Sequence, residues 1–180
     1  LQYLESILSR GIRAVSWQDS EYPAQLRNIS NPPYIFYCQG QIEAAAQPCI
    51  GIVGSRQASN YGRTVAHRFA RELAGHGITI VSGMARGIDS EAHLGALESG
   101  KTAAVLGNGL NIIYPPENKH LFEQITMSGL VMTEFPLNSG PEPKDFPMRN
   151  RIISGLCRGI VVIEARQKSG ALITADFALE

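Results

Sequence analysis

Residues 49–56 read Cys-Ile-Gly-Ile-Val-Gly-Ser-Arg, a short apolar run that ends in glycine, serine and arginine. Similar apolar runs, without alternating polar residues, follow at 78–81, 102–106, 130–132 and 160–163. Strands that are covered on both faces have this composition. Helical patterns occupy 61–76, 88–99, 118–127 and 149–156, and another begins near Ala171. This order predicts an α/β fold with a doubly wound, mostly parallel sheet and helices on both faces.

The first 48 residues are organised differently. Residues 1–10 carry apolar side chains at helical spacing, and 12–17 and 34–38 predict two strands separated by a loop that contains prolines. We expect residues 1–48 to be the end of a preceding module plus an extension of the sheet. Residues 49–180 then form the main domain, whose last helix is cut at its C-terminus.

The composition is that of an ordinary globular protein, with 44% apolar and 18% charged residues in 180. No apolar run approaches the ~20 residues of a membrane-spanning helix, and no signal peptide opens the chain. The three cysteines, Cys38, Cys49 and Cys157, have no C-x-x-C spacing, which disfavours a zinc site and a disulfide framework. We therefore expect a reduced, cytoplasmic protein with no membrane contact.

The net charge is zero, with 16 basic and 16 acidic residues, but the charges are unevenly distributed. Residues 48–71 hold four arginines and no acid. Residues 144–168 hold two acids and six basic residues, which are Lys144, Arg149, Arg151, Arg158, Arg166 and Lys168. Charge runs are usually solvated helix faces. Two local excesses dominated by arginine, whose planar fork suits phosphate, nevertheless favour an anionic ligand.

Small residues follow the predicted strands at the ends where ligands bind in open parallel sheets. These loop residues are Gly54, Ser55 and Arg56, then Gly83, Ala85, Arg86 and Gly87, then Gly107 and Gly109, and finally Ser169 and Gly170. Glycine lets backbone N–H groups approach a ligand, and a helix that starts just afterwards favours an anion. One such loop can be only a tight turn, but several on one edge predict a phosphate-binding surface.

Known cofactor and catalytic patterns are missing from these loops. The first loop lacks G-x-G-x-x-G, no acid ends the second strand, and no G-x-x-x-x-G-K-[ST] is present, which disfavours NAD and ATP. Asp89 and His93 are four residues apart, and we expect them to hydrogen-bond to each other rather than to bind a metal. Ser55 lacks the setting of a nucleophile. We expect no cofactor, no metal and no catalytic set.

The segment 143–151 combines an aromatic residue with basic ones. Pro143 and Pro147 should keep the chain extended, so that Phe146 lies on a loop between them. A loop phenylalanine is often a small satellite core residue. Here its neighbours are Lys144, Arg149, Asn150 and Arg151, and an aromatic ring beside a basic groove is typical of sites that hold single-stranded nucleic acid.

These motifs together resemble the DNA-processing protein A family (DprA, also called Smf), from about residue 20 to the end of the chain. The matching residues are Gly54-Ser55-Arg56, Ser82-Gly83-x-Ala85-x-Gly87-Ile88-Asp89, Gly107-x-Gly109 with Tyr114-Pro115, Phe146-Pro147-x-Arg149-Asn150-Arg151, and Ser169-Gly170-Ala171. The resemblance implies an extended Rossmann-like fold that binds and protects single-stranded DNA without enzymatic activity. It also implies a homodimer that loads RecA recombinase onto incoming DNA in natural transformation and recombination.

Two other functions stay open. Related Rossmann-like enzymes of the nucleoside-monophosphate phosphoribohydrolase type use a Pro-Gly-Gly-x-Gly-Thr loop with a nearby glutamate. This chain lacks that loop, and its Glu134 stands in Thr133-Glu134-Phe135-Pro136. The other open function is that of a small nucleotide-sensing module that uses the same phosphate loops.

Overall fold

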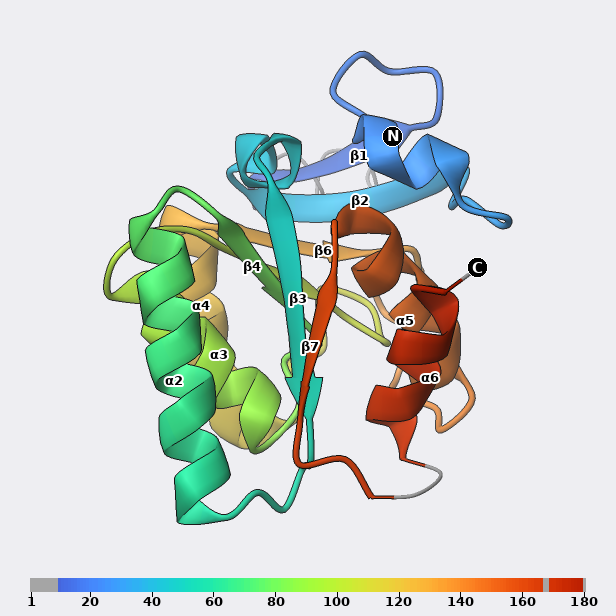
Figure 1. The fold of residues 1–180 in the computed structure, drawn as a ribbon. Coiled ribbons are helices and arrows are strands. Elements are labelled where there is room, and N and C mark those ends of the chain that lie inside the picture. Colours follow the sequence, from blue (N-terminus) through green and yellow to red (C-terminus); the bar gives the residue numbers. More distant parts are fainter. Residues whose placement is uncertain (1–9, 167–168, 180) are drawn as a thin grey trace.

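A seven-stranded sheet runs through the part of the chain that the computed structural model describes, residues 10–166 and 169–179 (Figure 1). Its strands are β1 (Ile12–Ser16), β2 (Ile35–Gly40), β3 (Cys49–Gly54), β4 (Thr79–Ser82), β5 (Thr102–Val105), β6 (Leu130–Thr133) and β7 (Ile160–Ile163). Their spatial order is β1-β2-β6-β5-β4-β3-β7. The strands from β6 to β7 in this order pair in parallel, whereas β1 and β2 join the edge beside β6 in antiparallel pairing.

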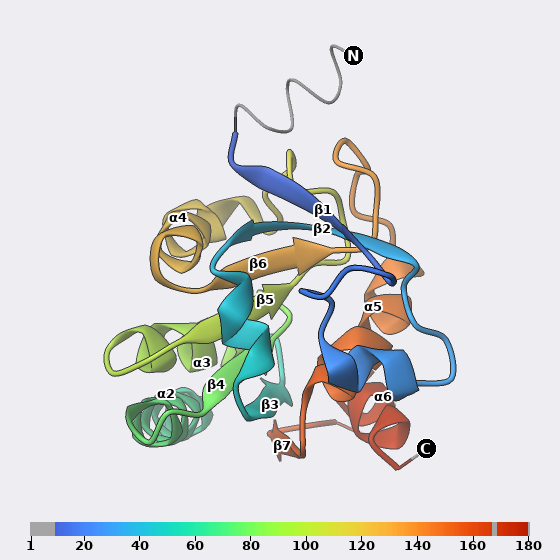
Figure 2. The ribbon, with the colours of Figure 1, turned by 90° about the horizontal axis from the view of Figure 1, so that it is seen from above.

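Helices cover both faces of this sheet. Figures 1 and 2 show α2 (Asn60–Gly75), α3 (Ile88–Leu97) and α4 (Lys119–Ser128) on one face, and α5 (Asp145–Leu156) and α6 (Gly170–Phe177) on the other. Three short 3-10 helices lie in connections: η1 (Ala24–Asn28), η2 (Ile42–Ala46) and η3 (Pro116–Asn118). The predicted fold class is confirmed.

One local prediction differs from the structure, and another lies almost entirely outside the described residues. Helix α5 begins at Asp145, four residues before the predicted start, so the expectation that Phe146 lies on an extended loop is wrong. Pro147 is tolerated there because the first turn of a helix leaves its N–H groups unpaired in any case. The helix predicted over residues 1–10 falls almost entirely on residues 1–9, which lie outside the described part of the chain.

The continuous apolar strands contribute side chains to hydrophobic cores on both faces of the sheet. Ile52 and Ile80 pack with α2 and α3, whereas their chain neighbours Val53 and Val81 pack on the opposite face. Successive side chains of a strand point to opposite faces, so a strand covered on both sides has no face turned to solvent. Cys38 and Cys49 are buried among these apolar side chains as free thiols. Burial raises the pKa of each to about 11.

No helix within residues 10–166 and 169–179 has both the length and the apolar character needed to cross a membrane. Likewise, no three His, Cys, Asp or Glu side chains of that part of the chain are grouped as metal ligands.

Helices α2 and α3 pack against each other through small residues. Ala66, Ala70, Ala92 and Ala96 are fully buried between them and the sheet. A Cβ atom on Gly95 would lie 2.1 Å from the His67 carbonyl oxygen, a backbone atom that cannot rotate away. The absence of a side chain at Gly95 therefore sets the distance between the two helices.

Replacing this glycine should push the helices apart. Gly95→Ala is expected to lower the free energy of unfolding by about 1–3 kcal/mol, the usual cost of overpacking, in urea titrations followed by circular dichroism. The matched control is Gly75→Ala in α2, where a Cβ would meet nothing closer than 3.7 Å. The control should be neutral or slightly stabilising, and equal losses in both variants would contradict the packing explanation.

Candidate functional site

A cavity of about 360 Å³ opens beyond the C-terminal ends of β3, β4 and β7. We call it the strand-end pocket. Its lining residues are Val53, Gly54, Ser55, Arg56, Ala85, Asp89, Pro143, Phe146, Pro147, Arg149, Asn150, Ile153, Arg166, Ser169, Gly170, Ala171, Ile173 and Thr174. Cavities of this volume hold small organic ligands, and the position is where ligands bind in open α/β sheets.

A second, much smaller cavity of about 20 Å³ adjoins it, and Arg56, Ala85 and Phe146 line both. We call it the side pocket. Its lining residues are Arg56, Gly83, Ala85, Arg86, Gly107, Asn108, Tyr114, Pro115 and Phe146. The fold therefore brings most of the residues singled out in the sequence to one edge of the sheet.

Four of those residues line neither cavity: Gly87, Gly109, Lys144 and Arg151. Gly87 has φ +76°, and a Cβ there would meet the Ser55 carbonyl oxygen at 2.3 Å. Glycine at this position therefore lets the loop after β4 pack against the loop after β3. Gly109 packs in the same way against the carbonyl oxygens of Pro136 and Leu137. Packing against backbone atoms therefore requires glycine at both positions, independently of any ligand.

Lys144 and Arg151 are both paired with acids. The Lys144 ammonium lies 2.8 Å from the Glu142 carboxylate, in an exposed pair. The Arg151 guanidinium contacts Glu134 through two nitrogens, and its Nε donates to the Asn31 carbonyl oxygen at 2.8 Å. Only 11% of the Arg151 side chain is exposed. Arg151 therefore ties α5 to β6 and to the N-terminal segment.

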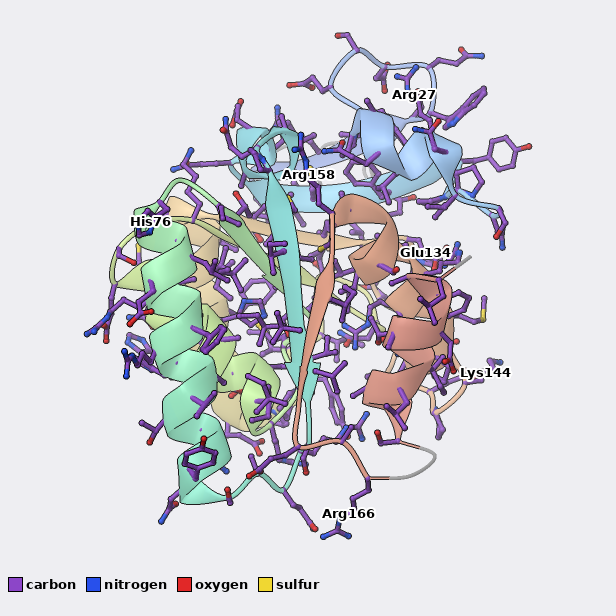
Figure 3. All side chains as sticks on the ribbon, in the orientation of Figure 1. Arg27, His76, Glu134, Lys144, Arg158 and Arg166 are labelled. Carbon is purple, nitrogen blue, oxygen red and sulfur yellow. The ribbon has the colours of Figure 1, made fainter. Side chains whose placement is uncertain are left out.

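Arg56 and Arg166 are the exposed cations at the strand-end pocket, and neither forms an ion pair with any residue between 10 and 166 or 169 and 179. Figure 3 shows Arg166 beyond the C-terminal end of β7 and Arg158 at the opposite end of that strand. The Arg158 N–H bonds to Cys49 at the start of β3, so Arg158 is not part of this site. Lys168 lies outside the described residues.

Phe146 separates the two cavities and is half-buried. The Arg56 guanidinium carbon lies 5.3 Å from the centre of its ring, within cation–π range. The Tyr114 ring is 5.7 Å away at 40°. A nucleobase that stacks on Phe146 would therefore either share the ring with the Arg56 guanidinium or displace that guanidinium.

Arg149 is buried, with 4% of its surface exposed, although the sequence suggested a backbone-binding residue. Its guanidinium donates to the carbonyl oxygens of Gly83 and Val105 and to Asn150 Oδ1. A Cβ on Gly83 would lie 2.5 Å from this guanidinium, so only glycine leaves room for it. Burial lowers the pKa of Arg149 to about 10, and the nearby Asp89 opposes that shift. Arg149 thus joins α5 to the ends of β4 and β5.

Asp89 completes this connection from α3. One carboxylate oxygen, Oδ2, accepts from the N–H groups of Gly83, at 3.1 Å, and Ala85, at 3.3 Å. Burial raises the pKa of Asp89, while Arg149 and these two amides lower it. The loop 83–85 is therefore held by the Asp89 carboxylate on one side and by the Arg149 guanidinium on the other.

The expected Asp89–His93 hydrogen bond is wrong. The Thr102 hydroxyl donates to the Ile80 carbonyl oxygen, so it accepts from His93 Nδ1 at 2.7 Å, which makes Nδ1 the protonated nitrogen. His93 Nε2 is buried without a partner in the described structure. Burial, together with the nearby Arg149 charge, lowers the pKa of His93 to about 3.

The start of α6 forms the far wall of the strand-end pocket. Ser169 stands at its N-cap position, yet its side chain caps no N–H group and its Oγ has no partner among the described residues. Asn150 Nδ2 donates to the Gly170 carbonyl oxygen at 3.0 Å and fixes this helix end against α5. The unpaired N–H groups of a first helical turn favour an anion.

Sequence reasoning missed three residues of this site. Arg166 was counted in a charge excess but was not assigned to the site, although it shortly precedes Ser169-Gly170. Tyr114 was noted only as part of a motif, and its ring contacts Phe146 across 32 residues of sequence. Asp89 was paired with His93, because helical spacing brought them together and the loop amides could not be foreseen.

The fold and the site define a class: a Rossmann-like domain with a pocket at the ends of its parallel strands, lined by arginines and an aromatic ring. The family model "DNA recombination-mediator protein A" matches residues 13–180. The chain belongs to this family, as its motifs indicated. Protein Smf of Synechocystis is 45% identical over 99% of this chain and 46% of its own length. The chain spans about half the length of the curated relatives it matches.

Two solved structures have the same fold. DNA processing protein A of Streptococcus pneumoniae has a TM-score of 0.89 and 38% identity, over 97% of this chain and 63% of that one. The protein of the same name from Helicobacter pylori has a TM-score of 0.84 and 29% identity, over 92% of this chain and 76% of that one. The latter structure is described as showing a single-stranded DNA binding mode.

Removing the buried arginine should unfold the site. Arg149→Met keeps the approximate volume but leaves Asp89 without its cation and two carbonyl groups without a donor. We expect a loss of about 3–5 kcal/mol in the free energy of unfolding, the usual effect of leaving a buried charge without a compensating one. The control is Arg166→Met, at an exposed arginine of the same pocket. A stable Arg149→Met variant would show that the connection is dispensable.

Acid should destabilise the protein through His93. Its pKa is about 3 in the folded protein and 6.5 by reference, so the unfolded chain binds more protons between these values. The free energy of unfolding should then fall as pH drops through this window, by up to about 1.4 kcal/mol per pH unit. His93→Asn, which keeps a donor near Thr102, should flatten the pH dependence measured by urea titration. An unchanged slope would show that another group titrates there.

Proposed function

We propose that this domain binds single-stranded DNA in the strand-end pocket and along the side pocket. The observation that carries the proposal is that Arg56 and Arg166, two exposed arginines without acidic partners in the described chain, line the same pocket as the ring of Phe146. Backbone phosphates need cations, and bases of any sequence stack on an aromatic face. Family membership and the Helicobacter pylori structure support the same ligand.

Each wall of the pocket has a proposed role. Arg56 and Arg166 bind phosphates, together with the first N–H groups of α6 after Ser169. The Ser55 hydroxyl accepts from the Gln57 N–H at 3.1 Å, which leaves its proton to donate to the strand. Phe146 stacks on a base. The surfaces around Gly54, Gly83, Ala85, Gly107 and Gly170 let the strand approach the backbone closely.

The other residues expected at the site act differently in this proposal. Arg149, Asn150 and Arg151 are positioning residues, because their side chains hold α5 against β4, β5, β6 and α6. Gly87 and Gly109 shape the loops that carry the binding residues. Lys144 is a peripheral contact that must exchange Glu142 for a phosphate, and Arg86 is treated below.

Finer proposals concern the longer protein. The family resemblance supports a cytoplasmic homodimer that protects incoming DNA and loads RecA recombinase onto it in natural transformation. In this proposal residues 49–180 carry the DNA site and 1–48 link it to a preceding module. Light scattering of the full-length protein and co-precipitation with RecA in the presence of oligo-dT test assembly and partnership separately.

Oligonucleotides of increasing length separate the DNA-binding function from the two nucleotide-based alternatives. A nucleotide sensor or a nucleoside-monophosphate hydrolase saturates with a mononucleotide. A strand-binding protein gains affinity with each added nucleotide until the length of its site is reached. Release of free base from a nucleoside monophosphate would favour the enzyme instead.

Charge and stacking should be separable at this site. Arg56→Ala should weaken oligo-dT binding and reduce the slope of log K against log salt by about 0.7, the value for one phosphate contact on a single strand. Phe146→Leu removes the ring but no charge. It should lose about 1–3 kcal/mol of stacking while the slope stays nearly the same. Fluorescence anisotropy at several salt concentrations measures both.

Arg158→Ala is the matched control for charge, because this exposed arginine lies at the opposite end of β7. It should leave the slope unchanged. A thermal melt of each variant separates folding from binding. Parental affinity in folded Arg56→Ala would move the phosphate site elsewhere, and a destabilised Phe146→Leu with parental affinity would make Phe146 only a packing residue.

A further inference from the structure

Arg86 is a third exposed arginine at the strand ends, and it is paired with an acid. Its Nε donates to Glu117 Oε1. About half of each side chain is exposed, 53% for Arg86 and 50% for Glu117. The ion pair raises the pKa of Arg86 and lowers that of Glu117, so both are charged at neutral pH. Arg86 therefore differs from Arg56 and Arg166, which have no acidic partner in the described chain.

The position of Glu117 is fixed independently of this ion pair. The next residue, Asn118, donates from Nδ2 to the Met84 carbonyl oxygen at 2.8 Å and to Ser90 Oγ at 2.9 Å. These bonds attach η3 to the start of α3 and to the loop between β4 and α3, which also carries Arg86. The carboxylate is thus held at Arg86 by neighbouring contacts, and breaking the ion pair would leave the segment in place.

Arg86 also lies next to the proposed DNA site. It lines the side pocket together with Arg56 and Phe146, which form the wall shared with the strand-end pocket. A strand that leaves the strand-end pocket past Phe146 meets Arg86 as its next cation. At Arg86, a phosphate of the strand meets the Glu117 carboxylate, which already occupies the guanidinium.

Exposed ion pairs contribute little stability, so a phosphate can displace one. We propose, on the basis of the proposed function, that Glu117 is a built-in competitor for the DNA phosphate at Arg86. A strand binds Arg86 only by replacing the carboxylate, which weakens every complex that extends over the side pocket. A ligand confined to the strand-end pocket does not meet this competition. Glu117 therefore sets how tightly the domain holds strands longer than one or two nucleotides.

A gain of affinity tests this competition. Glu117→Gln keeps the size and polarity of the side chain but releases Arg86. We expect it to bind oligo-dT about two- to fivefold more tightly, the factor expected from losing an exposed ion pair. Binding of thymidine monophosphate should stay the same. The control is Glu72→Gln, which frees Arg68 from an equally exposed pair on α2 and should change neither affinity.

Removing an acid near DNA can also tighten binding through the general field of the protein, so the gain must depend on Arg86. In an Arg86→Ala background, Glu117→Gln should give no gain. The same gain in both backgrounds would overturn the proposal, as would parental affinity in folded Glu117→Gln. Thermal melts should show all variants folded, since the pair is exposed.

The two proposals fail in different ways. If the parent chain does not bind oligo-dT, or binds it independently of Arg56, the proposed function fails and this inference fails with it. If Arg56→Ala behaves as expected and Glu117→Gln matches the parent, only the competition is refuted.

Discussion

The site depends on one buried cation. Arg149 enters the ends of β4 and β5 from α5 and donates to the carbonyl oxygens of Gly83 and Val105, while Asp89 holds the facing amides from α3. Burying an arginine costs free energy unless its donors are satisfied and an acid lies near. Nε and Nη1 of Arg149 are hydrogen-bonded and Asp89 lies near, so two helices on opposite faces of the sheet are fixed to the same loop. The walls of the strand-end pocket follow from that connection.

The distribution of ion pairs explains how a neutral chain can favour an anion at one place. Arg151, Lys144 and Arg86 each have an acidic partner, which cancels much of their field at short range. Arg56 and Arg166 have none in the described chain, and they lie at the same pocket. The electrostatic attraction of a phosphate is therefore local, although the sum of all charges is zero.

Packing in the rest of the molecule supports this edge of the sheet. The N-terminal strands extend the sheet beside β6, and the Asn31 carbonyl oxygen accepts from Arg151, so the first segment contributes to the position of α5. On the opposite face, Gly95 lets α3 lie close to α2, and α3 carries Asp89. Residues far from the pocket thus help to position Asp89 and Arg149 at the loop that both of them contact.

The sequence by itself determined the sheet, most of its helices and the edge of the sheet at which we propose that a ligand binds. Apolar runs buried on both faces and small residues at the strand ends are local patterns, and they are visible in a single chain. It could not show the partners of charged side chains, because Arg149 meets Gly83 across 66 residues and Arg151 meets Glu134 across 17. Arg56 and Arg149 are the same residue type, yet Arg56 is exposed and Arg149 is buried. Only the tertiary structure decided which arginine is free for a ligand, because burial and pairing depend on neighbours that folding brings together.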